Sequence, residues 1–263
     1  MNFKESIRIT LTIAAKDIVD AVKNKMTLSI MLGVGLMMLT GLALPLLFGL
    51  RRVPTAVEGH AVYPSAELGL QPSLLAINLT VLLLIIGLAL VPYLMIEEKE
   101  THTFDALLVS PARFSHVVCG KALAGLFYCL CAAVVVFLFN TRWIAHWEIA
   151  TLAFLLGAAF AVAAGLLMGI VSENPTTVNL WVGLLLMLLL VPMLLEELVS
   201  AKLPSILQTI LSWMPSVAMG KLIGLSMSGV VPALDVWSNV GVLAIESFVF
   251  YALVIWCVRR SDR

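Results

Sequence analysis

Long apolar runs separated by short polar segments make up most of the chain. Five runs approach or exceed the roughly 20 residues that a membrane-spanning helix needs, and they cover residues 26–50, 74–96, 122–139, 149–171 and 236–258. A sixth run, 180–197, reaches this length only if Glu196 and Glu197 lie at a membrane interface. The pattern predicts an all-α membrane protein with six transmembrane helices in residues 26–258.

The segment 1–25, before the first run, has a weaker helical periodicity. At about 100° per residue its apolar side chains form one stripe, and charged or polar residues cover the opposite face. The stripe comprises Ile7, Leu11, Ala14, Ile18 and Val22. This pattern is typical of a helix that lies along a membrane surface. We expect an interfacial elbow helix here; an ordinary juxtamembrane anchor is the alternative.

The region 198–232 is apolar but interrupted. Its breaks are Lys202, Pro204, Pro215, Lys221 and Pro232. No uninterrupted run of about 20 residues remains, so a full crossing is not expected. We expect two short re-entrant helices on the outer side, near 205–214 and 216–227. Irregular backbone at that depth must be covered by protein or face a water-filled cavity.

The basic residues predict the orientation. Of the 16 lysines and arginines, eleven fall in 1–25, in the loop 97–121 or in the tail 259–263. Because lysine and arginine are retained on the cytoplasmic side, both termini and this loop are expected there, with the protein in the inner (cytoplasmic) cell membrane. A formal net charge of zero argues against nucleic-acid binding.

The loop after the second predicted span reads EEKETHTFDALLVSP, residues 97–111, and its pattern indicates a short helix. A charged lead-in is followed by a threonine that can cap a helix, an acid suited to the helix dipole, and an apolar face. In that order the residues are Glu97, Glu98 and Glu100, then Thr103, then Asp105, and finally Phe104, Leu107 and Leu108. Such a helix either docks a cytoplasmic partner or rests on lipid headgroups. The other cytoplasmic connection, 172–179, has Pro175 as a turn former and no apolar face.

This loop resembles the coupling loop of the membrane subunits in the ABC-2 export family. The shared pattern is two glutamates, Lys-Glu-Thr, a second threonine, an acid, Leu-Leu and a proline, followed by Gly120-Lys121. The chain departs from the pattern at His102, where the family usually has glycine, and at Phe104, where leucine is commoner. The resemblance extends to the elbow helix, the six spans and the outer helices.

The resemblance implies that the chain is the permease of an ABC exporter. Such a permease forms a dimer, here expected to be a homodimer, with two copies of a P-loop ATPase that binds ATP and Mg. It would move a hydrophobic or amphipathic substrate, such as a drug, lipid, peptide or haem-like molecule, out of the cytoplasm. The residues implied to contact the ATPase are Glu97, Glu98, Glu100, Thr103, Phe104, Asp105, Leu107 and Leu108.

The chain itself is not expected to be an enzyme or to hold a cofactor or metal. Its Gly-Lys pairs at 120–121 and 220–221 are not P-loops, because Ser115 and Pro215 occupy the place of the first glycine. A secondary transporter or channel is the alternative, but no inverted repeat or paired broken helix is evident. A membrane-embedded hydrolase is the least favoured class, since the spans hold no paired His or Asp motif.

Two features inside the predicted spans are candidates for function. Glu246 falls near the centre of the last span, where a carboxyl is costly; it either lines the substrate path or makes a packing hydrogen bond. A stripe of small residues in the fourth span allows another helix to approach closely, either within the subunit or at a dimer seam. The stripe consists of Gly157, Ala161, Gly165 and Gly169.

Overall fold

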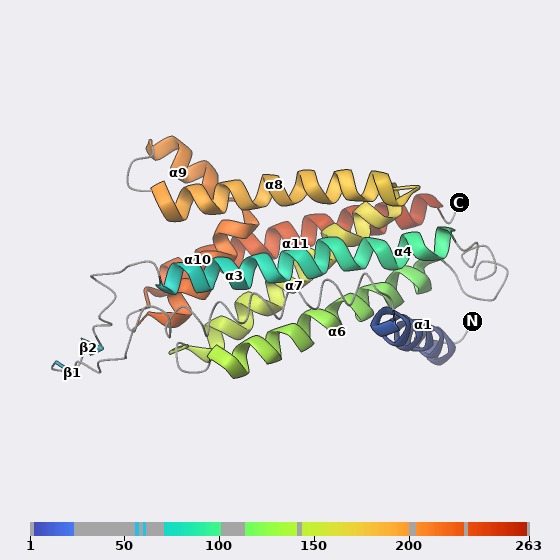
Figure 1. Ribbon diagram of the computed structural model, residues 1–263, viewed down its shortest axis with the longest axis horizontal. Coiled ribbons are helices and arrows are strands. Elements are labelled where there is room, and N and C mark those ends of the chain that lie inside the picture. Colours follow the sequence, from blue (N-terminus) through green and yellow to red (C-terminus); the bar gives the residue numbers. More distant parts are fainter. Residues whose placement is uncertain are drawn as a thin grey trace.

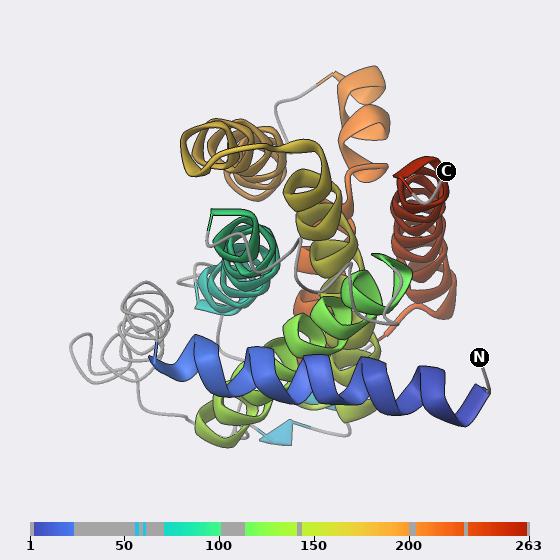
Figure 2. The same ribbon diagram turned by 90° about the vertical axis from the view of Figure 1, so that its right-hand side faces the viewer.

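A computed structural model describes residues 3–23, 56–57, 60–61, 71–100, 114–140, 144–199, 204–228 and 231–261. In these ranges the chain forms a bundle of long helices, with one further helix lying across one end of it (Figure 1; Figure 2). The predicted first span, 26–50, and most of the predicted coupling helix, within 101–113, lie outside the described residues.

Five helical stretches in the described ranges are long and apolar enough to cross a membrane. The first consists of α3 (Gln71–Ile85), the π-helical turn η2 (Ile86–Leu90) and α4 (Val91–Glu100), which follow one another without a break. The others are α6 (Phe114–Asn140), α7 (Trp147–Val171), α8 (Pro175–Val199) and α11 (Ala233–Ser261). Each overlaps one of the predicted spans two to six, and the helical membrane architecture is confirmed for this part of the chain.

Helices α6 and α8 begin earlier than the apolar runs indicate. Residues 114–121 form the first two turns of α6 rather than a separate stretch. Pro175, which the sequence suggested as a turn residue, is instead the first residue of α8. Asn174 caps this start, because its Oδ1 accepts hydrogen bonds from the backbone N and the Oγ1 of Thr177, both at 2.8 Å. The connection from α7 to α8 is therefore only 172–174.

Helix α1 (Phe3–Lys23) runs across the end of the bundle where α4 ends and α6 begins (Figure 2). The last residues of α11 lie at this same end, here called the α1 end (Figure 1). Of the stripe predicted to face the membrane, Ile7, Leu11 and Val22 are exposed, whereas Ala14 is buried and Ile18 is partly buried. The neighbouring face, with Ile13 and Ala21, is buried against the bundle.

The opposite end carries the two short helices that the proline pattern predicts. They are α9 (Ser205–Ser212) and α10 (Pro215–Met227), and their axes differ by 87°. Helix α8 ends and α11 begins at this end, so α9 and α10 together leave and re-enter the bundle at the same end without crossing to the other (Figure 1). Most of α10 is buried among α3, α7, α8 and α11, whereas α9 is largely exposed. A short antiparallel pairing of β1 (Ala56–Val57) with β2 (His60–Ala61) was not predicted.

Polar contacts hold α10 in the bundle. The hydroxyl of Ser216 donates to the carbonyl oxygen of Leu189 in α8 at 2.6 Å, one turn before the helix-interior Pro192. Lys221 forms an ion pair with Glu196 at 2.8 Å. Glu196, which the sequence left at a membrane interface, therefore has a partner within the chain.

Helix α7 lies at the centre of the bundle and contacts every other described spanning helix. Its stripe of small residues packs within the chain. A Cβ added at Gly165 would overlap the carbonyl oxygen of Gly87, and one added at Gly87 would overlap Ala161. Farther along the stripe, Gly169 faces Met95. The backbones of α7 and η2 thus meet where neither has a bulky side chain, and of the two roles considered for the stripe the structure shows packing.

Candidate functional site

The structure describes the helices on both sides of residues 101–113, here called the coupling segment. Glu97, Glu98 and Glu100 belong to the last turn of α4, which precedes the segment, and Phe114 begins α6 directly after it. The remaining predicted contact residues lie outside the described residues, and their roles stay predictions: Thr103, Phe104, Asp105, Leu107 and Leu108.

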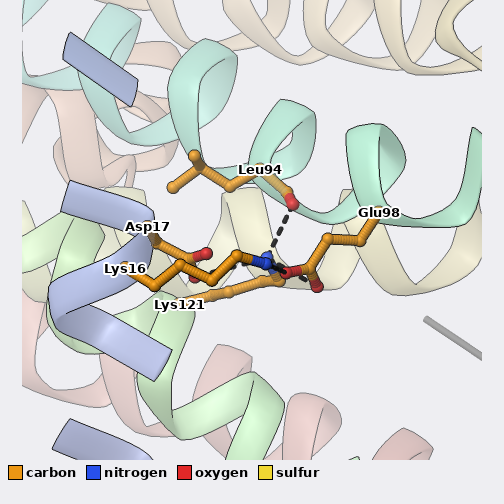
Figure 3. A network of polar contacts seen from close by, with 5 residues as sticks. All are labelled: Lys16, Asp17, Leu94, Glu98 and Lys121. Atoms are coloured by element: carbon orange, nitrogen blue, oxygen red, sulfur yellow. Dashed lines mark hydrogen bonds and ion pairs between the residues drawn. The ribbon is translucent and has the colours of Figure 1, made fainter. Parts of the chain in front are cut away.

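A buried lysine joins the helices on both sides of the coupling segment. The Lys121 side chain, in α6, has no exposed surface, and its Nζ lies 3.0 Å from Glu98 Oε2 and 3.3 Å from Asp17 Oδ2. The same Nζ donates a hydrogen bond to the carbonyl oxygen of Leu94 at 2.6 Å. The half-exposed Lys16 pairs with the other oxygen of Glu98 at 3.3 Å. Figure 3 shows that these residues of α1, α4 and α6 converge on one point, here called the Lys121 cluster.

The charges of the Lys121 cluster balance, with two lysines and two carboxylates. Lys121 donates hydrogen bonds to Asp17 Oδ2 and to the carbonyl oxygen of Leu94 and forms an ion pair with Glu98 Oε2, so the buried ammonium has both hydrogen-bond acceptors and opposite charge around it. Burial raises the pKa of Asp17 above its ordinary range; the charge of Lys121 opposes this rise, and the charge of Glu98 adds to it. For Asp17, the effect of burial on the pKa is therefore larger than the opposite effect of the lysine charge.

A close crossing of α1 over α6 makes these ion pairs possible. The two helices meet at Gly120, where an added Cβ would lie only 2.7 Å from Cγ2 of Ile13. Farther along α6, the hydroxyl of Tyr128 donates to the carbonyl oxygen of Ile18 at 2.6 Å. The adjacent Gly120 and Lys121 thus have different tasks: the glycine lets α1 approach, and the lysine binds it.

A second contact holds the first turns of both helices together. Ser6 Oγ and His116 Nε2 lie 2.6 Å apart, within hydrogen-bond distance. Because Ser6 and His116 both lie in the first turn of their helix, α1 contacts α6 from its first turn onward. Helix α1 is therefore fastened along the start of α6 at several separate points.

Lys99, the next residue after Glu98, binds a different helix. Its Nζ donates to three carbonyl oxygens at the C-terminal end of α7, those of Gly169 (2.9 Å), Ile170 (3.2 Å) and Ser172 (2.8 Å). A cation at this position satisfies carbonyls that have no partner within their helix and suits the negative end of the helix dipole. The last turn of α4 is thus held by α1 and α6 through Glu98 and by α7 through Lys99.

Comparison with known families identifies this architecture. The model of the ABC-2 family transporter proteins matches residues 11–256, from within α1 to within α11. The chain belongs to the ABC-2 transporter family. It is a multi-pass membrane subunit of an ABC transporter, and such subunits work with an ATPase subunit. No curated protein matches the chain.

Several cluster residues of this ABC-2 subunit were not among the predicted site residues. Asp17 could have been suspected, because it lies on the helix face of Ser6, Ile13 and Ala21 and away from the charged face. A carboxylate on such a face needs a cation. Lys121 matched the family pattern, but which residues it pairs with depends on how α1 folds back across α6, and no local pattern reports that.

The structure gives the positions of two predicted site residues of the ABC-2 subunit, Glu98 and Glu246. Glu98 was expected to contact an ATPase, but its side chain is 8% exposed and pairs with lysines of the same chain. An ATPase contact for Glu98 stays a prediction, while its position inside the Lys121 cluster is observed. Glu246 lies at the midpoint of α11 and is partly exposed.

Proposed function

We propose that the chain is the permease subunit of an ATP-driven exporter and that the Lys121 cluster transmits movement of the coupling segment to the spanning helices. In this proposal a homodimer in the inner (cytoplasmic) membrane, with its α1 end toward the cytoplasm, binds two copies of a P-loop ATPase. The ATPase binds ATP and Mg. The substrate is a hydrophobic or amphipathic molecule that leaves the cytoplasm.

The observation that carries the proposal is the position of the cluster. Glu98 lies just before the coupling segment and Lys121 shortly after it, and they are 3.0 Å apart. The end of α4 and the start of α6, on either side of the segment, are thus joined to each other. The end of α4 and the start of α6 are here called the base of the segment. A force applied to the segment moves this base as a unit, because a packed and ion-paired base has few other arrangements available.

The contacts of the base define which helices would move together. Lys121 connects the base to α1 through Asp17, and Lys99 connects it to the C-terminal end of α7. Helix α7 contacts all the other described spans. A displacement at the coupling segment therefore has a continuous path of packed and ion-paired groups into the centre of the bundle.

The outer surfaces of the bundle support an apolar pathway between two copies. Helices α8 and α11 expose large apolar side chains along most of their length, among them Leu180, Leu184, Met187, Phe248 and Trp256. In the proposed dimer, part of this surface faces lipid and part faces the substrate.

Introducing negative charge on the apolar face of the predicted coupling helix tests the docking step. Phe104→Glu with Leu108→Glu should abolish co-purification of a P-loop ATPase from native membranes, because both residues lie on the apolar face of the predicted helix. Ala106→Glu is the matched control, since residue 106 projects from the opposite face, and it should retain the ATPase. Retention of the ATPase by the double variant would show that the segment does not dock it.

A further inference from the structure

Within the described part of the chain, Glu246 has no polar partner although it lies near the middle of a spanning helix. It stands at the midpoint of the 29-residue helix α11, and the described part of the chain gives its side chain no hydrogen bond and no ion pair. It is partly exposed beside the buried face of α11, which carries Leu243 and Ser247. A carboxyl group this deep in a spanning helix is costly unless a positive charge or a hydrogen-bond donor accompanies it.

The apolar runs predicted as spans contain no cation, and the cations of the described spanning helices lie at the α1 end, among them Lys99 and Lys121, which are paired there. The predicted spans 26–50, 74–96, 122–139, 149–171, 180–197 and 236–258 contain no lysine, arginine or histidine. A second copy of the chain has the same spans, so dimerisation brings no spanning cation to Glu246 either. A positive charge opposite Glu246 would therefore come from a proton or from a bound molecule.

The surroundings of Glu246 suit an organic cation better than a metal ion. In the described part of the chain no group of three or more His, Cys, Asp or Glu side chains could hold a metal. Hard cations such as Ca²⁺ need about six to eight oxygen ligands. An ammonium or similar organic cation requires much less: one carboxylate and an aromatic or apolar surface.

Such a surface follows Glu246 along α11. Phe250 is one helical turn away on the same side, partly exposed, and its ring packs edge-to-face on Phe160 of α7 with centroids 5.1 Å apart. Val249 and Leu253 follow Glu246 by three and seven residues and are 45% and 41% exposed. A charged head at Glu246 would thus leave an apolar body lying along an aromatic ring and two aliphatic side chains.

We propose that Glu246 binds the positive charge of the transported molecule and that the substrate class is an amphipathic organic cation. This inference rests on the proposed export function and makes its substrate more specific. Glu246 neutralises the cationic head, Phe250 presents its ring to that head, and Val249 and Leu253 contact the apolar body. Anions of the same shape are rejected, because Glu246 would repel them in a medium that screens charge poorly.

Two probes of nearly the same shape and opposite charge test the proposal, namely tetraphenylphosphonium and tetraphenylborate. Binding is measured by equilibrium dialysis on the permease in lipid nanodiscs, with empty nanodiscs subtracted. The wild type should bind the cation in preference to the anion. Glu246→Gln should weaken binding of the cation by about tenfold or more, because it removes the only charge opposite it, and should not weaken binding of the anion. Glu246→Asp should keep the preference.

Each other outcome counts against the proposal. Equal cation binding by the wild type and Glu246→Gln, or an equal loss of both probes, would assign Glu246 to protonation or packing. If Glu246→Gln does not assemble, Phe250→Leu replaces it: the proposal requires weaker binding of the cation alone, and unchanged binding of both probes would overturn it. Because binding needs no ATPase, failure here with intact ATPase docking removes only the substrate assignment. Retention of the ATPase by the variant with Phe104→Glu and Leu108→Glu would instead count against the proposed function.

Discussion

Replacing Lys121 by methionine should loosen the whole α1 end of the bundle. Methionine fills a similar volume but leaves the carboxylates of Asp17 and Glu98 buried next to each other without the ammonium between them. Removing one partner from a buried ion pair costs about 3–5 kcal/mol, or roughly two to three and a half orders of magnitude in the opening equilibrium. Lys16→Met is the matched control: the Lys16 side chain is half-exposed and Glu98 keeps Lys121 as a partner, so the expected cost is about 0–1 kcal/mol.

A buried cysteine of the same helix provides the assay. Cys129 is 1% exposed in α6, and all four cysteines are free. In a background with serine at Cys119, Cys131 and Cys257, a thiol-reactive fluorophore labels Cys129 only when the bundle opens. Heated in nanodiscs, Lys121→Met should become reactive at a clearly lower temperature than the background protein, and Lys16→Met at nearly the same temperature.

A charge-compensated variant decides whether charge is the reason. Combining Lys121→Met with Asp17→Asn and Glu98→Gln removes the unpaired carboxylates, and replacing a buried ion network in this way is often close to neutral. The triple variant should therefore recover most of the lost stability. The reasoning is refuted if Lys121→Met is as stable as Lys16→Met, or if the triple variant is no better than Lys121→Met.

Two further predictions concern Asp17 and Gly165. Because burial raises the pKa of Asp17, the folded protein binds the proton of this carboxyl more tightly than the unfolded chain does. The resulting contribution to stability is fully present below the ordinary pKa of about 3.9 and is lost as the pH rises through the raised pKa. Asp17→Asn removes this titration, so the thermal unfolding of the variant should have a flatter pH profile than that of the wild type; parallel profiles would contradict this. In thermal unfolding, Gly165→Ala should cost about 1–3 kcal/mol, because the added methyl group would overlap the Gly87 carbonyl. The control Gly183→Ala, with open space around it, should be neutral or stabilising by up to about 1 kcal/mol. Equal effects of the two substitutions would contradict the packing of α7 on η2.

Local patterns were sufficient to predict the spanning helices that the structure describes and the pair α9 and α10, although not every helix boundary. Apolar runs predict spanning helices because a membrane leaves the backbone few alternatives to a helix. The breaks at Pro204 and Pro215 predict α9 and α10 nearly to the residue, because proline begins a helix readily and cannot continue one. Hydropathy failed at the start of α6, where the polar residues of 114–121 are helical because they pack against α1.

The Lys121 cluster illustrates what local patterns do not contain. Asp17, Glu98 and Lys121 are far apart in the sequence, and each has an ordinary exposed interpretation by itself. Family resemblance marked Glu98 and Lys121 as parts of one motif but did not pair them with each other or with Asp17. Only the path of α1 across α6 brings the three charges together, and that path depends on Gly120.

The order of the cluster residues along the chain has a consequence for biosynthesis. Asp17 precedes Lys121 by 104 residues, and Glu98 also precedes it. Since a chain is made from its N-terminus, both acids leave the ribosome before the lysine that they will surround. The ammonium of Lys121 can therefore enter a site whose negative charges are already waiting, and it need not be buried alone at any stage. An N-terminal truncation that removes Asp17 would take away one of the two carboxylates that pair with Lys121, even if all the spans remain.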